Sequence, residues 1–141
     1  MKAMVYHGNK DLRLENVGEP VPGPGEVKLR IDYCGICATD IEEYLYGPVF
    51  ISAGTPHPLT GVALPLTIGH EMTGTVVERG QDGGTIDVGD RVVVNPRLSC
   101  MQCPPCLAGQ DDLCRLSRFL GSAIDGSYAQ FIAVPAANAH L

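Results

Sequence analysis

Apolar and polar side chains alternate along several short stretches of the chain, which is the pattern of half-buried strands. Residues 27–33 alternate without interruption, and residues 11–17 show similar spacing after a turn at Gly8-Asn9. Most of the other apolar runs are short and bounded by glycine or proline, as strands usually are. The expected strands are residues 2–6, 11–17, 27–33, 73–79, 91–94 and 128–134.

One segment, residues 38–46, has the composition of a helix. Thr39 or Asp40 could act as its N-cap, and Glu42 and Glu43 favour the positive end of a helix dipole. We therefore predict a single well-defined helix just after the third strand.

Glycine and proline break up the rest of the chain, with 17 Gly and 11 Pro among 141 residues. Residues 19–25 are predicted to form a rigid connector, and residues 47–66 a long irregular loop. Residues 95–118 carry four cysteines and are expected to form an irregular lobe. The sequence thus predicts one mainly β (α+β) domain over residues 1–141, a partly open β-barrel with one or two short helices.

Charge and composition then exclude several classes of protein. The formal net charge is −6 and the ten Lys and Arg form no basic stripe, which disfavours nucleic-acid binding. The apolar runs are too short to span a membrane, and no signal peptide is visible at the N-terminus. We expect a cytoplasmic protein, in whose reducing surroundings clustered cysteines bind metal more often than they form disulfides.

Four of the six cysteines fall within fifteen residues, namely Cys100, Cys103, Cys106 and Cys114. A tetrahedral zinc ion held by four sulfurs at ~2.3 Å needs a chain that curls around the ion, and the two-residue spacings supply that curl. Four protein ligands leave no position for a substrate, so this zinc would be structural. The alternatives are two disulfides or free buried cysteines.

Two further segments carry groups able to bind metal. Cys34-Gly35-Ile36-Cys37 could be a redox dithiol or half of a zinc site, although the βαβ context of a thioredoxin-like motif is absent. His70, in Gly69-His70-Glu71, could be a metal ligand or an ordinary packed histidine.

Taken together, these motifs resemble a known family. The chain is similar to the N-terminal, GroES-like catalytic domain of the zinc-dependent medium-chain alcohol dehydrogenases, whose motif order it follows. Within that family it looks most like the 2,3-butanediol and sorbitol dehydrogenases, through Glu43-Tyr44-Leu45, Gly47-Pro48 and residues 57–61. The family motifs are Cys34-Gly35-Ile36-Cys37-x-Thr39-Asp40, Gly69-His70-Glu71-x2-Gly74-x5-Gly80, Gly89-Asp90-Arg91-Val92 and the four-cysteine segment.

The resemblance implies a catalytic zinc at Cys37 and His70, with Glu71 as a direct ligand or an adjacent carboxylate that exchanges with one. Such a zinc acts as a Lewis acid on an alcohol oxygen, and hydride then passes to a nicotinamide. Thr39 matches the hydroxyl that takes the alcohol proton, or it is only an N-cap. Asp40 matches the carboxylate that orients His70, or it is a solvated acid of the first helical turn.

The sequence departs from the family at three points. Glu42 stands where several relatives have a relay histidine, so the last step of proton release would use that carboxylate or water. Gly83 stands where the family has a small or aliphatic residue. No Gly-x-Gly-x-x-Gly motif follows any strand, so the nucleotide-binding domain is absent from these residues.

From this we expect an N-terminal catalytic-domain fragment of an NAD(P)-dependent alcohol or polyol dehydrogenase that would be homo-oligomeric at full length. The 141 residues would hold the structural zinc, bind the catalytic zinc weakly or not at all, and oxidise no alcohol alone. The long loop, residues 47–66, would line the pocket, and its apolar Val49, Phe50 and Ile51 suggest a small substrate. The alternatives are a zinc-stabilised GroES-like binding module without chemistry and, against the charge, a zinc-sensing nucleic-acid module.

Overall fold

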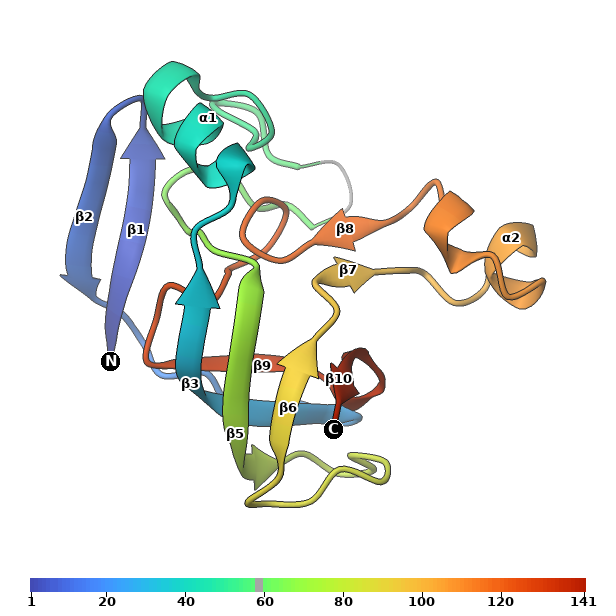
Figure 1. The fold of residues 1–141 in the computed structure, drawn as a ribbon. Coiled ribbons are helices and arrows are strands. Elements are labelled where there is room, and N and C mark those ends of the chain that lie inside the picture. Colours follow the sequence, from blue (N-terminus) through green and yellow to red (C-terminus); the bar gives the residue numbers. More distant parts are fainter. Residues whose placement is uncertain (58–59) are drawn as a thin grey trace.

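Antiparallel strands are the main regular secondary structure of the computed structural model, which describes residues 1–57 and 60–141 (Figure 1). The strands are β1 (Lys2–Gly8), β2 (Asp11–Asn16), β3 (Glu26–Gly35), β4 (Leu66–Thr67), β5 (Glu71–Arg79), β6 (Arg91–Val94), β7 (Arg97–Leu98), β8 (Arg118–Phe119), β9 (Phe131–Pro135) and β10 (Ala139–His140). The helices are α1 (Ala38–Tyr46), α2 (Pro104–Leu107), η1 (Asp111–Leu113) and η2 (Ala136–Asn138).

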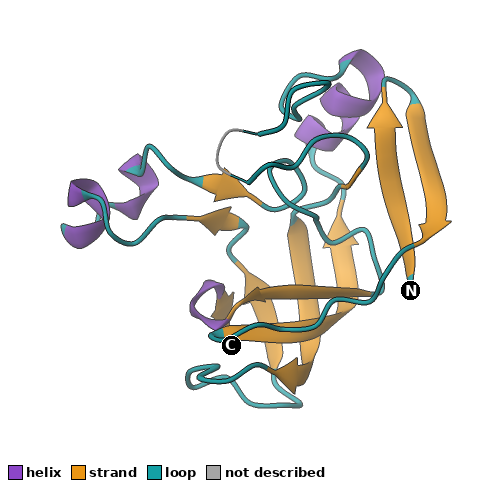
Figure 2. Ribbon diagram, turned by 180° about the vertical axis from the view of Figure 1, so that it is seen from behind, coloured by secondary structure: helices purple, strands orange, loops and turns teal. Residues whose placement is uncertain are grey.

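The largest sheet has five strands in the order β10-β6-β5-β3-β9 and curls into a half-barrel (Figure 2). Its concave side holds the main core, where Val27, Leu29, Val76 and Val134 are almost fully buried. The period-2 pattern of β3 produces this arrangement, because alternate side chains of a strand face the same side of the sheet. The register between β3 and β5 pairs Gly35 with Glu71, which brings the end of one strand to the start of the other.

A second sheet, β2-β1-β4, lies beside the half-barrel and supports α1. The turn between β1 and β2 holds the end of this helix: the N–H of Lys10 donates to the carbonyl of Tyr44 at 2.8 Å, and the Asn9 amide donates to that of Leu45 at 2.6 Å. The Tyr6 hydroxyl donates to the carbonyl of Glu43 at 2.7 Å. The helix is therefore fixed against β1 before it reaches the long loop.

The four-cysteine segment projects away from the sheets, as Figures 1 and 2 both show. The pair β7–β8 forms its base, and α2 and η1 lie at its far end. Pro104 and Pro105 begin α2, where prolines are tolerated because the first helical N–H groups need no partner within the helix.

The predicted mainly β class is confirmed, with several corrections. β5 begins at Glu71 rather than at residue 73, and the last predicted strand, 128–134, is β9 at Phe131–Pro135, followed by a further short strand, β10. The predicted loop 47–66 is irregular where it is described, up to β4; Pro58 and Leu59 lie outside the described residues.

The predicted N-cap of α1 is wrong. Cys37 occupies the N-cap position, and Asp40 is the third helical residue, whose carboxylate accepts the Cys37 N–H at 3.0 Å. A carboxylate three residues into a helix can reach back to the cap amide, which explains why the acid lies there. Thr39 is thereby free of a capping role and Asp40 is buried rather than solvated.

Candidate functional site

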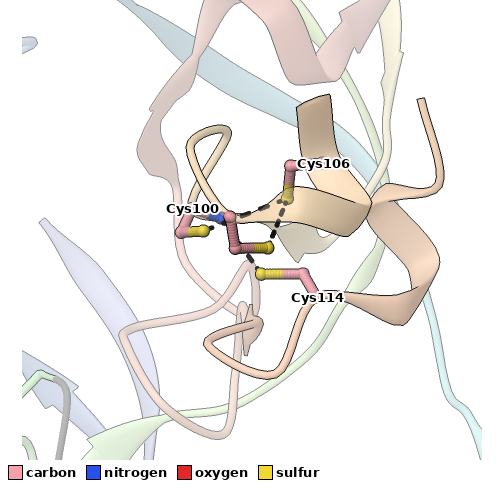
Figure 3. Close-up of side chains that lie close together, drawn as sticks. Cys100, Cys106 and Cys114 are labelled. Carbon is pink, nitrogen blue, oxygen red and sulfur yellow. Dashed lines mark hydrogen bonds between the residues drawn. The ribbon is translucent and has the colours of Figure 1, made fainter. Parts of the chain in front are cut away.

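The four predicted cysteines of the lobe come together as one cluster. The ligand sulfurs of Cys100, Cys103, Cys106 and Cys114 all lie within 4.8 Å of one another (Figure 3). We call them the four-cysteine group. A zinc ion bonded to four sulfurs at ~2.3 Å places those sulfurs ~3.8 Å apart. The Sγ atoms of Cys106 and Cys100 are 3.9 Å apart, and those of Cys106 and Cys103 are 3.4 Å apart, so the group fits such an ion.

The surroundings of these sulfurs also suit a cation. A backbone hydrogen bond from Gln102 lowers the pKa of the Cys100 thiol to about 6, while burial raises the pKa of Cys106 to about 12. Burial therefore opposes ionisation of Cys106, and a divalent cation bound among the four sulfurs would reverse that effect. None of the six cysteines, all within the described residues, forms a disulfide.

A second cluster joins Cys37, His70 and Glu71, whose ligand atoms lie within 4.8 Å of one another. We call these three residues the open group. Cys37 stands at the start of α1, His70 just before β5, and Glu71 is the first residue of β5. Their meeting depends on the pairing of β3 with β5, because the register sets Gly35, two residues before Cys37, opposite Glu71. A Cβ on Gly35 would lie 2.6 Å from Glu71 Oε2, so a larger residue there would make the Glu71 carboxylate shift.

Two neighbours fix the orientation of the His70 ring. Asp40 Oδ1 lies 3.6 Å from Nδ1, and Thr39 Oγ1 lies 3.4 Å from Nε2. The ring edge also packs on Phe119 with 5.6 Å between centroids. A carboxylate beside one ring nitrogen favours a proton there and leaves the lone pair of the other for a metal. Nε2, which faces Thr39, is then the ligand atom.

Asp40 is held by more than the histidine. Its Oδ2 accepts the Cys37 N–H at 3.0 Å and the Tyr128 hydroxyl at 2.8 Å. Burial, followed by the hydrogen bond to Asp40, raises the pKa of Tyr128 well above its ordinary value, so the phenol remains a donor. This hydrogen bond of Tyr128 could not be predicted from the sequence, because its partner Asp40 lies 88 residues away along the chain.

Two residues of the open group, His70 and Glu71, line a cavity of about 860 Å³, and Cys37 is not among the lining residues. That volume is in the range of small-molecule sites. Thr39, His70 and Glu71 provide polar groups, while Phe50, Ile51 and Phe119 are among the apolar lining. Of the loop residues expected to line a pocket, Phe50 and Ile51 do so and Val49 does not.

Glu43 lies in the same wall and was missed as a site residue. Its buried carboxylate accepts the N–H of Val49 at 3.0 Å and that of Phe50 at 2.7 Å, which ties the loop to α1. Its position, one helical turn beyond Thr39 on the same face, was the available signal. Glu42, by contrast, is exposed and outside the cavity wall.

The remaining cysteine, Cys34, is half-buried and outside both groups. Its Sγ lies 3.0 Å from Ser127 Oγ, and burial raises the pKa of its thiol. Cys34 therefore has the surroundings of a packed side chain.

An antiparallel half-barrel that carries one closed group of four thiols and one open group beside a cavity defines the GroES-like domain of a dehydrogenase. Residues 23–141 match the alcohol dehydrogenase GroES-like domain. The chain belongs to the zinc-dependent medium-chain alcohol dehydrogenase family.

Individual relatives agree. The chain is 51% identical over 96 residues to (R,R)-butanediol dehydrogenase of Bacillus subtilis (strain 168), which is 68% of this chain and 28% of that protein. It is 40% identical to L-threonine 3-dehydrogenase of Streptomyces avermitilis over 98% of this chain and 38% of the relative. The crystal structure of 2R,3R-butanediol dehydrogenase from Bacillus subtilis has a TM-score of 0.87 at 39% identity, covering 99% of this chain and 39% of that one. The chain thus spans less than half the length of these relatives. Among its described residues, no helix has the length and apolar character needed to cross a membrane.

Proposed function

We propose that this chain is the zinc-binding catalytic domain of an NAD(P)-dependent dehydrogenase that acts on a small alcohol or polyol. The observation that carries the proposal is the open group, Cys37, His70 and Glu71, of which His70 and Glu71 line a largely apolar cavity. Butanediol and threonine, for which two relatives are named, both carry hydroxyl groups. A purely structural zinc module would have no use for such a group.

Zinc bound at Cys37, His70 and Glu71 would keep a position open toward the cavity and supply Lewis-acid chemistry. Thr39 Oγ1, 3.4 Å from His70 Nε2, would accept a hydrogen bond from the hydroxyl of an alcohol in the cavity, and as that proton moves to Oγ1 the proton of Thr39 itself would pass to water. Asp40 keeps the His70 ring in one orientation. Phe50 and Ile51 would supply apolar surface for the carbon chain of such an alcohol.

The four-cysteine group would hold a second, structural zinc. We further propose that the full activity needs a nucleotide-binding domain as partner, that the whole enzyme is a homo-oligomer, and that it works in the cytoplasm. The six unpaired cysteines and the −6 charge support a reducing compartment and the absence of a nucleic-acid partner.

Titration of the purified 141-residue chain with Co²⁺ or Zn²⁺ tests this proposal. We expect one tightly bound ion and a second that binds more weakly. The variant His70→Ala should lose the second ion and keep the first, whereas the matched variant Cys34→Ser should keep both. A His70→Ala variant whose affinity for the second ion equals that of the wild type overturns the proposal, as does a chain that binds no ion at all.

The chain alone should oxidise no alcohol with NAD or NADP. NAD-dependent turnover would contradict this expectation. Two ions that both remain bound during dialysis against a chelator would contradict the expected weak metal binding of the open group in the isolated chain.

A further inference from the structure

Tyr128 lies where the segments that carry the open group meet. Its hydroxyl donates to Asp40 Oδ2 at 2.8 Å and lies 3.0 Å from the carbonyl oxygen of Gly35. Gly35 ends β3 two residues before Cys37, and Asp40 contacts the His70 ring. One hydroxyl therefore touches both the segment before Cys37 and the carboxylate that orients His70.

The ring of Tyr128 fixes the third segment. It covers Gly69, the residue before His70, so closely that a Cβ on Gly69 would lie 2.5 Å from a ring carbon. Gly69 has φ +94°, a conformation that other residues rarely adopt. The N–H of Tyr128 donates to the Ile68 carbonyl, and that of Ser127 donates to the Gly69 carbonyl, both at 2.9 Å. The backbone and the side chain of Tyr128 together fix the segment that leads into His70.

We propose that Tyr128 is a positioning residue for the open group, setting the distance between Cys37 and His70 through Asp40, Gly35 and Gly69. The inference rests on the proposed metal-binding function of that group. Tyr128 itself belongs to neither group of ligands.

The Tyr128 hydroxyl is the group that acts on Asp40, and through Asp40 on His70. Without it, Asp40 Oδ2 keeps only the Cys37 N–H, and the carboxylate is freer to turn away from His70 Nδ1. The ring contact with Gly69 is independent of the hydroxyl. Phenylalanine at position 128 therefore separates the two contributions, because it keeps the ring and removes the donor.

The test compares Tyr128→Phe with Tyr6→Phe in the full 141-residue chain. Tyr6 is also a buried tyrosine whose hydroxyl donates one hydrogen bond at 2.7 Å, but its acceptor, the Glu43 carbonyl, lies near the other end of α1. Both variants should lower the equilibrium constant for folding about 5-fold, through the loss of one hydrogen bond. Co²⁺ titration followed by visible absorption reports the affinity and ligand geometry of each ion.

We expect Tyr128→Phe to weaken binding of the second ion about 10-fold, which is the loss typical when a hydrogen-bond partner of a metal ligand is removed. The absorption bands of that ion should also change. The ion of the four-cysteine group should bind as before, and Tyr6→Phe should leave both affinities within about 2-fold.

Equal second-ion affinities in the wild type and Tyr128→Phe overturn this inference and leave the proposed function intact. Equal losses in Tyr128→Phe and Tyr6→Phe also overturn it, since the effect is then one of general stability. A wild-type chain without a second ion also overturns this inference, because Tyr128 then positions no metal site in this chain. A second ion that binds His70→Ala as tightly as the wild type overturns the proposed function itself and this inference with it.

Discussion

The four-cysteine group and the open group use similar donor atoms but are built in different ways. All four thiols come from one segment of fifteen residues that projects from the sheets. The open group joins residues separated by 33 positions, Cys37 and His70, and its geometry depends on the register between β3 and β5. A local site should therefore depend on its metal for order, and a site built on the sheet should be ordered by the fold.

The largest effect is expected in the lobe. Cys106→Ser removes one of the four thiol ligands proposed for the structural zinc. We expect at least a 100-fold loss of affinity for this tightly bound first ion, together with unfolding of residues 95–118. The reason is that a small metal-bound segment draws its folding free energy from the metal. Metal content after gel filtration and thermal unfolding by circular dichroism would measure both effects.

Cys34→Ser is the control for that variant, because Cys34 lies outside both groups. It should retain the first ion. A Cys106→Ser chain that keeps its tightly bound ion would remove the basis for treating the lobe as metal-dependent.

The difference between a local site and a site built on the sheet also explains which site residues could be predicted from the sequence. The spacing of Cys100, Cys103 and Cys106 predicts a metal cluster without knowledge of the fold, since a short chain can close around an ion by itself. The contact of Asp40 with His70 became an expectation only through family resemblance. Tyr128 could not be found, because its contacts with Gly35 and Gly69 exist only after β3, β5 and the segment before β9 have packed together.

Local signals failed at α1 in a related way. Thr39 and Asp40 have the propensity of N-caps, yet the register of β3 places Cys37 at that position, and each acquires a contact with His70 instead. Tertiary packing thus overrode a capping preference worth about 1 kcal/mol.

The second largest effect is expected in the cavity wall beside the open group, which is held in place by hydrogen bonds rather than by a metal ion. Glu43→Leu leaves the N–H groups of Val49 and Phe50 without their acceptor, and we expect a loss of about 2–4 kcal/mol. Hydrogen exchange at those two amides should accelerate at least about 10-fold, following the lost stability.

Glu42→Leu is the matched control, since Glu42 is adjacent but exposed. It should change stability by no more than about 0.5 kcal/mol. Unchanged exchange at Val49 and Phe50 in Glu43→Leu would show that the loop is held by its own packing.

The smallest effect appears only at alkaline pH and again separates the two regions. Burial raises the pKa of Tyr6 to about 12 and that of Tyr128 further, while residues 95–118 contain no tyrosine. A pKa raised on folding means that the stabilisation is complete below the unfolded value near pH 10 and is lost as pH rises through the folded value. Phenolate absorbance should therefore show two late-titrating groups in the wild type and one in Tyr6→Phe or Tyr128→Phe. Above about pH 10 the second ion should be released before the first, because ionisation of Tyr128 removes its hydrogen bond to Asp40 and Tyr128 does not touch the lobe. Loss of the first ion at the lower pH would mean that the lobe, and not the sheet-built site, is the less stable region.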